Sequence, residues 1–147
     1  MRINARPPAF FGRTQRNLEQ QKERALTFLR GLEKPDASSY QDLLADDFEF
    51  EMMGRLPGVA PVRGKDAFLK STPPMLKAMF PNGLNIKLIS IIAEGPHVAV
   101  QAESDTTAGN GKKYANRYHF YLLFKGDKIA QVREYNDTNH VREVFMS

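Results

Sequence analysis

Three side chains that can move protons or form strong hydrogen bonds lie close together near the C-terminus. Glu134, Asn136 and Asp137 fall within four residues, directly after a strand-like run. Carboxylates avoid burial unless a partner or the surroundings adjust their proton affinity. In apolar surroundings a carboxyl group loses hydration and its pKa rises, so it can act as a general acid or base near pH 7. These groups therefore either cap a following helix or line a pocket.

Side chains alternate between the two faces of a strand, which indicates where the polar groups point. One face of the run from residue 114 to 124 becomes apolar towards its end, so we assign it to the interior: Tyr114, Asn116, Tyr118, Phe120, Leu122 and Phe124. Asn116 and Tyr118 then supply polar groups at the mouth of a pocket. The other face suits an outer sheet surface: Ala115, Arg117, His119, Tyr121 and Leu123. In the last strand, Glu134 shares a face with Val132 and Asn136.

Helices are predicted in the N-terminal half of the chain. Residues 17–20 (NLEQ) match a capping box, so the first helix is expected to begin at Asn17 and to end near Gly31, before Pro35. A second short helix is expected from about residue 36 to residue 45.

A strand is expected at 48–52, where apolar and acidic residues alternate. The following segment, 54–64, is too rich in Gly and Pro for regular structure. A third helix from about residue 65 is expected to be interrupted at Pro73-Pro74.

Strands are predicted in the C-terminal half, at 84–94, 97–107, 114–124 and 128–136. The pair Asn110-Gly111 is typical of a type I′ hairpin turn. A closing helix is expected at 138–145, with Asp137 accepting backbone N–H bonds near Asn139 or His140. Helices followed by an antiparallel meander indicate an α+β fold with helices on one face of a curved sheet.

Length and composition narrow the classes of protein further. A chain of 147 residues suits one domain, and the absence of cysteine excludes disulfides and thiolate chemistry. No apolar run reaches the ~18 residues of a membrane helix, and the N-terminus lacks the apolar segment of a secretory signal. We therefore expect a cytoplasmic protein without a membrane partner.

The positive charge is confined to the N-terminal segment. The formal net charge is +4, and residues 1–17 carry four arginines and no acid, which leaves 17 basic and 17 acidic residues in the rest. A domain without basic excess or a recognition motif does not predict nucleic-acid binding. We expect residues 1–16 to form a flexible basic arm, or one that docks on a partner subunit, and residues 17–147 to form the domain.

The order of elements and a set of short motifs resemble the SnoaL-like and ketosteroid isomerase-like superfamily, also called nuclear transport factor-like, with a cystatin-like fold. The motifs read Y-x-N-x-Y, G-x-K-I and R-E-Y-x-D-T, and their residues are Tyr114, Asn116, Tyr118, Gly126, Lys128, Ile129, Arg133, Glu134, Tyr135, Asp137 and Thr138. The resemblance covers about residues 17–146. It implies a cone in which a curved antiparallel sheet packs on N-terminal helices around an apolar pocket.

The resemblance also implies a range of functions. Members include isomerases, polyketide cyclases, dehydratases and limonene-type epoxide hydrolases, and also noncatalytic binding domains, since one scaffold hosts many chemistries. We expect a cofactor-independent isomerase, cyclase or dehydratase acting on a small hydrophobic polyketide-, terpenoid- or steroid-like molecule. The alternatives are a noncatalytic ligand- or protein-binding domain and an epoxide hydrolase. The outer sheet face often dimerises in this superfamily, so we expect a homodimer.

Comparison with limonene-type epoxide hydrolases assigns the candidate site residues. Glu134 and Asp105 fall where those enzymes carry two pocket aspartates, and Glu103 replaces the arginine between them. Glu51 and Met53 replace a water-positioning Tyr and Asn, which argues against epoxide hydrolysis. Acids without an internal arginine repel one another, and this raises at least one pKa.

We predict Glu134 as the principal base, Asp105 as a partner acid, and Asn116 or Tyr118 as donors to a developing oxyanion. Other interpretations stay open. Glu134 is alternatively a surface acid paired with an arginine, and Asp105 a hairpin-end residue. Tyr118 is alternatively a core tyrosine, and Asn116 a strand-to-loop link. The three histidines lack metal-ligand spacing, so no metal site is expected.

Overall fold

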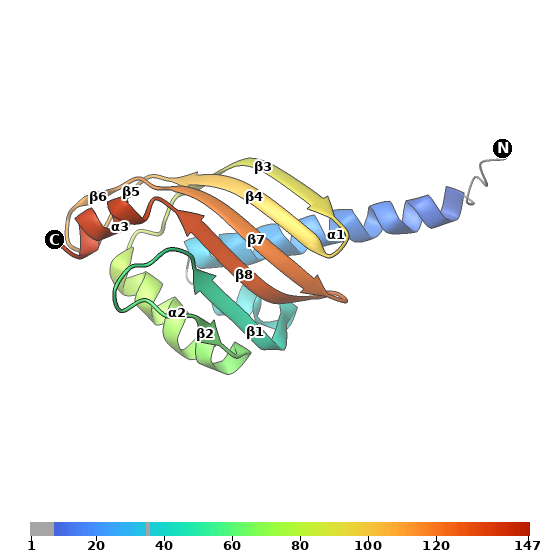
Figure 1. Cartoon of the computed structure of the whole chain (residues 1–147), viewed down its shortest axis with the longest axis horizontal. Coiled ribbons are helices and arrows are strands. Elements are labelled where there is room, and N and C mark those ends of the chain that lie inside the picture. The colour runs from blue at the N-terminus through green and yellow to red at the C-terminus, as the bar shows by residue number, and fades with distance from the viewer. Residues whose placement is uncertain (1–7, 35) are drawn as a thin grey trace.

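The computed structural model describes residues 8–34 and 36–147, with side chains from residue 17 onward. A long helix and two short 3₁₀ turns precede most of the sheet (Figure 1). The elements are α1 (Pro8–Glu33), η1 (Ala37–Ser39), η2 (Gln41–Leu43), β1 (Leu44–Met52), β2 (Val62–Arg63), α2 (Lys65–Met79), β3 (Ile86–Glu94), β4 (His97–Ser104), β5 (Thr106–Thr107), β6 (Lys113–Tyr114), β7 (Arg117–Lys125), β8 (Lys128–Asn136) and α3 (Thr138–Phe145).

Six strands form one curved sheet in the order β2-β1-β8-β7-β4-β3, and β5 and β6 form a small separate pair. All neighbours in the large sheet are antiparallel except β1 and β8, which are parallel. Helices α1 and α2 lie against this sheet, and α3 lies beside β5 and β6 (Figure 1). The predicted α+β cone is confirmed. The last strand lies inside the sheet, between β1 and β7.

The core between helix and sheet is rich in aromatic side chains. Helix α1 buries a stripe with helical spacing, Ala25, Phe28, Leu29 and Leu32. The ring of Phe28 lies 5.1 Å from the ring of Tyr40 in an edge-on arrangement, and 6.0 Å from that of Phe68. Such pairs add about 1 kcal/mol beyond the burial of their area. This cluster fixes α1, α2 and the start of β1 relative to one another.

The predicted start of the first helix at Asn17 is wrong. Helix α1 begins at Pro8 and runs through Asn17, whose side chain is exposed. Proline suits the first turn of a helix because its missing N–H has no partner there, and no further proline separates it from Asn17. In Figure 1 the N-terminal part of α1 projects beyond the sheet. Of the predicted arm, residues 1–7 lie outside the described part of the chain.

Two further helix predictions are corrected. The expected helix at 36–45 is replaced by two 3₁₀ turns, because Asp36 caps the backbone N–H of Ser38 and Leu44 already pairs with Ile129 in the sheet. Helix α2 is continuous through Pro73 and Pro74, which were expected to interrupt it. The carbonyls that these prolines leave without an N–H partner belong to the half-buried Leu69 and the exposed Lys70.

The hairpin at Asn110-Gly111 has a different turn from the one predicted. Gly111 has φ +84°, but Asn110 is absent from the non-glycine residues with positive φ, so the turn is not type I′. The N–H of Gly111 donates to Ala108 and the N–H of Ala108 donates to Lys112, which closes a three-residue loop with glycine in the left-handed region. In contrast, the predicted bounds of β8 and α3 are both confirmed.

Replacement of Gly31 by alanine should destabilise the protein, although alanine favours helices. A Cβ at position 31 would lie 2.7 Å from Tyr40 Cε1 and closer still to Cδ1, so the buried ring would have to move. Overpacking of this kind costs about 1–3 kcal/mol. Urea unfolding of Gly31→Ala should show that loss, with Gln20→Ala on the exposed face of the same helix as the control. A gain in stability would contradict the packing described here.

Candidate functional site

Glu134 occupies the middle of the sheet on its inner face. In the strand register it lies between Met52 of β1 and Phe120 of β7. Phe120 is buried, and Val132, two residues earlier on the same face of β8, is fully buried. Glu134 itself is only partly exposed. The predicted orientation of Glu134 towards the apolar interior is therefore what the structure shows.

Burial raises the pKa of the Glu134 carboxyl from 4.5 to about 7, and a hydrogen bond from Asn136 opposes part of this rise. Asn136 Nδ2 donates to Glu134 Oε2 over 2.6 Å. Of the two causes expected from the sequence, loss of hydration is the one that acts here, and repulsion between acids is not. The loss of water around the carboxyl raises the pKa, with no contribution from a second carboxylate.

Glu134 is not a surface acid paired with arginine. Within the described part of the chain, no ion pair joins it to Arg133 or Arg117. Arg117 is exposed, and Arg133 lies on the opposite face of β8, in register with Glu51 and Tyr121. The carboxyl therefore has no cation to hold its pKa down.

A chain of buried hydroxyl groups lies one step along the sheet from Glu134. Tyr118 OH lies 2.8 Å from Ser104 Oγ and donates to Tyr114 OH over 3.3 Å. Burial, and then the neighbouring Tyr114 and Glu134, raise the pKa of Tyr118 above its ordinary value. The pKa of Tyr114 is raised mainly by burial. Both phenols therefore keep their protons, and Tyr118 has a hydrogen-bonded partner on either side.

Asn116 is a structural link and not a free donor. Its Nδ2 donates to Tyr114 OH over 2.9 Å and to the backbone oxygen of Asp137 over 3.2 Å. Its Oδ1 accepts from the backbone N–H of Arg117 and of Asp137. All the hydrogen-bonding capacity of this buried amide is used inside the protein, so the predicted oxyanion role of Asn116 is replaced by the strand-to-loop alternative.

Tyr118 fits the core interpretation, since it is 6% exposed and its hydroxyl is satisfied by Ser104 and Tyr114. A ligand oxygen could receive its proton only by displacing one of these partners. Sequence reasoning missed Ser104, although alternation along β4 places it on the buried face with Val100 and Ala102.

Asp105 does not lie beside Glu134 in the structure. Its side chain is 63% exposed and lies 2.5 Å from the ammonium group of Lys113. Strand β4 ends at Ser104, so the alternation that would aim Asp105 at the interior no longer applies. The prediction of Asp105 as a partner acid is corrected: it is the hairpin-end residue of the alternative interpretation.

The remaining acids also lie away from the interior. Glu103 and Glu51 fall on the outer face of the sheet, in register with Arg117 and Arg133 respectively. Asp137 is exposed and caps α3, where its carboxylate accepts the backbone N–H of His140 as predicted. Of these five acids, Glu134 alone points towards the inner face of the sheet, in register with the buried Phe120.

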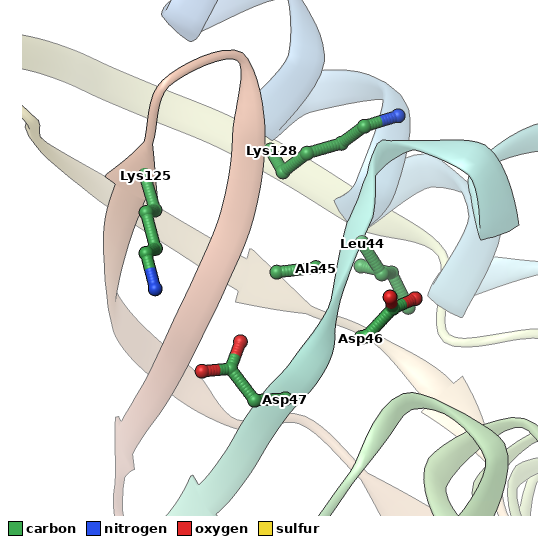
Figure 2. Close-up of a pocket in the computed structure, with 6 residues that line it drawn as sticks. All are labelled: Leu44, Ala45, Asp46, Asp47, Lys125 and Lys128. Atoms are coloured by element: carbon green, nitrogen blue, oxygen red, sulfur yellow. The ribbon is translucent and has the colours of Figure 1, made fainter.

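A separate hollow of about 450 Å³ opens where β1 leaves the sheet ladder. Leu44 pairs with Ile129, but the next pair is Glu49 with Gln131, so β1 bulges away from β8. Figure 2 shows the residues lining this hollow, which come from β1 and from the hairpin between β7 and β8: Leu44, Ala45, Asp46, Asp47, Lys125 and Lys128. It contains none of the candidate residues, so the apolar pocket predicted beside Glu134 stays a prediction.

Metal binding and membrane crossing find no support in the residues described. No group of three or more His, Asp or Glu side chains there is arranged to hold a metal ion. No helix in the same part of the chain is long and apolar enough to cross a membrane.

The sequence matches the family model of the SnoaL-like domain over residues 25–132. The chain belongs to the SnoaL-like domain family. The match runs from α1 into β8 and ends two residues before Glu134. Family membership therefore establishes the scaffold, and the SnoaL-like match itself does not extend to the candidate base. No curated protein sequence matches the chain significantly.

Several solved structures have the same fold as this SnoaL-like chain, although their sequence identity to it is low. A candidate SnoaL-like polyketide cyclase from Jannaschia sp. CCS1 is 15% identical, with 98% of each chain covered and a TM-score of 0.75. A candidate isomerase from Bacillus subtilis is 20% identical over 87% of this chain and 94% of its own, with a TM-score of 0.76. An LEH-like epoxide hydrolase from M. tuberculosis is 17% identical over 88% and 91%, with a TM-score of 0.69. These likenesses show the fold.

The pH dependence of the unfolding free energy of this SnoaL-like protein should reveal the burial of Glu134. Between pH 4.5 and about 7 the folded chain holds a proton at Glu134 that the unfolded chain has lost. The stability contributed by the group is therefore complete below pH 4.5 and is lost as the pH rises to about 7.

The free energy of unfolding of the wild type, minus that of Glu134→Gln, should fall by up to about 3 kcal/mol across this window and stay constant above it. Urea unfolding at a series of pH values measures the difference. Asp105→Asn, which alters an exposed carboxylate, serves as the control. A difference that does not change with pH would show that Glu134 is hydrated.

Proposed function

We propose that this protein is a cofactor-independent acid–base enzyme that isomerises, cyclises or dehydrates a small hydrophobic molecule, with Glu134 as the base. One observation carries the proposal: a desolvated carboxyl on the apolar inner face of the sheet, with a pKa of about 7. A base with this pKa is populated as carboxylate at neutral pH, and its conjugate acid is strong enough to return the proton.

The chemistry follows from that exchange. The carboxylate removes a proton from a carbon next to a carbonyl group, and the electron pair of the C–H bond moves into an enolate. Return of the proton to another carbon completes an isomerisation. Transfer of that proton to a β-hydroxyl group, which leaves as water, completes a dehydration. Attack of the enolate carbon on a second carbonyl, whose oxygen then takes the proton, completes a cyclisation. No step needs an oxidant or a metal. The predicted apolar pocket beside Glu134 would favour polyketide-, terpenoid- or steroid-like substrates.

Two alternatives compete less well. A noncatalytic binding domain of the same fold gives no reason for an acid in the apolar middle of the sheet, where an unpaired charge is costly. Epoxide hydrolysis, the second alternative, is the activity named for the M. tuberculosis neighbour. It would use two pocket carboxylates with an arginine between them, whereas Asp105 is exposed and Glu103 faces outward here.

Removal of the Glu134 carboxylate should abolish proton abstraction. We expect wild-type protein to exchange the α-hydrogens of 3-cyclohexenone and 2-tetralone in D₂O, with a rate that rises to a plateau above pH about 7. Glu134→Gln should lower that rate by about 100-fold or more, the usual contribution of a general base. Asp105→Asn should leave it unchanged, because Asp105 is at the surface. NMR integration of the ketone signals measures the exchange, and equal rates for wild type and Glu134→Gln would refute the role of Glu134.

We further propose that the outer face of the sheet forms a homodimer. Ile92 and Tyr135 are 67% and 43% exposed and lie on the face opposite the core, in register with Ala99 and His119 respectively. Ile89, 47% exposed, lies at the bulge of β3 where the register with β4 shifts. Exposed large apolar side chains on a sheet face favour association with a complementary surface. The expectation of a second copy as the partner rests on the family resemblance.

A charge placed in this face should break the dimer. Light scattering coupled to gel filtration should give twice the mass of the chain for the wild type and the single-chain mass for Ile92→Lys, because the two lysines would be desolvated near each other. Val59→Lys, a loop residue with 41% exposure, is the matched control and should remain dimeric. A wild type that is monomeric at micromolar concentration would refute this interface.

A further inference from the structure

Asn136 is the polar group in direct contact with Glu134. Its Nδ2 donates to Glu134 Oε2 over 2.6 Å, and both side chains lie on the inner face of β8. Across the sheet Asn136 is in register with Tyr118. The other neighbours of Glu134 in register, Met52 and Phe120, carry no titratable group. Asn136 is therefore the described side chain placed to adjust both the direction and the proton affinity of the carboxyl.

The other half of the Asn136 amide has no partner. Its Oδ1 is buried and, within the described part of the chain, accepts no hydrogen bond. Turning the amide over would bring Oδ1 to a protonated Glu134, but it would then bury the NH₂ group in the same unpartnered place. Whichever way it points, one polar end of Asn136 lacks a partner, and that costs folding stability.

Asn116, in the short connection between β6 and β7, provides a contrast. It is the same residue type and is 2% exposed, but its donors and its acceptor are all engaged, with Tyr114 and with backbone groups. An amide with this pattern holds the fold together. The side chain of Asn136, by contrast, makes one hydrogen bond within the described residues, and its partner is the proposed base.

We infer that Asn136 is a positioning residue kept for Glu134 and not for the fold: it holds Oε2 through one hydrogen bond and leaves Oε1 to meet the substrate. The inference rests on the proposed function for its catalytic meaning, but its physical content concerns Glu134 alone. A carboxylate that accepts a hydrogen bond holds its proton less tightly than one without it. Asn136 therefore keeps part of Glu134 ionised at neutral pH despite its burial.

The test replaces each asparagine by leucine, which is close to it in shape but forms no hydrogen bond. In Asn136→Leu, the pKa of Glu134 followed by ¹³C NMR of its carboxyl should rise by about one unit or more. Its melting temperature should equal or exceed that of the wild type. In Asn116→Leu, or in Asn116→Ser if the first does not fold, the melting temperature should drop by about 5 °C or more. Asn136→Val replaces Asn136→Leu if leucine prevents folding.

Activity adds a second readout where the ketone exchange assay works. The midpoint of the rise in rate with pH should then move upward in Asn136→Leu by the same amount as the NMR titration. The NMR arm needs no substrate, so a failure of the proposed function leaves it intact. A Glu134 pKa that stays within about 0.3 unit of the wild-type value overturns the inference. A loss of stability in Asn136→Leu as large as in the Asn116 variant overturns it as well.

Discussion

The removal of water from one carboxyl group is the interaction on which the rest of this site depends. Glu134 sits between Met52 and Phe120, and none of the ion pairs among the described residues involves its carboxyl. The fold makes this possible by inserting β8 between β1 and β7, so that an inward side chain near its end is surrounded by neighbouring strands. The same residue at a sheet edge would be hydrated, and it would titrate as an ordinary glutamate.

A network of satisfied polar groups lies on one side of this desolvated acid. Ser104, Tyr118, Tyr114 and Asn116 form a continuous buried network that ends on the backbone at Asp137, which in turn caps α3. Such a network fixes the end of β8 and the start of α3 relative to β7. The hydrogen bonds that make this region rigid lie beside Glu134 and do not include its carboxyl. The carboxyl can therefore change its protonation state without loosening the fold.

Sequence alone predicted the parts of the molecule where local pattern and tertiary structure agree. Period-two alternation identified the inward faces of β7 and β8, and with them the direction of Glu134 and Tyr118, and the cap at Asp137 followed from its place before α3. Asp105 could not be placed, because alternation has no meaning once β4 has ended at Ser104. The start of α1 was missed because the capping pattern at Asn17 is local, whereas the helix continues wherever no residue stops it. The hydrogen-bonding states of Asn116 and Asn136 could not be predicted either, because they depend on contacts between segments distant in the sequence. These tertiary contacts satisfy every polar atom of the Asn116 amide and leave the Asn136 oxygen without a partner.

The parallel pairing of β1 with β8 also sets an order of events during synthesis. Leu44 pairs with Ile129, so β1 finds this neighbour only after all the residues between β1 and β8 have been made. Until then β1 presents an unpaired edge on the side that β8 will occupy, and unpaired edges invite association with other chains. Closure of so distant a contact is also slow, because the intervening loop must first lose its freedom. A nascent chain that ends before β8 thus lacks Glu134 and also exposes β1 as an unpaired, aggregation-prone strand. The sheet and the candidate site are therefore completed in the same step.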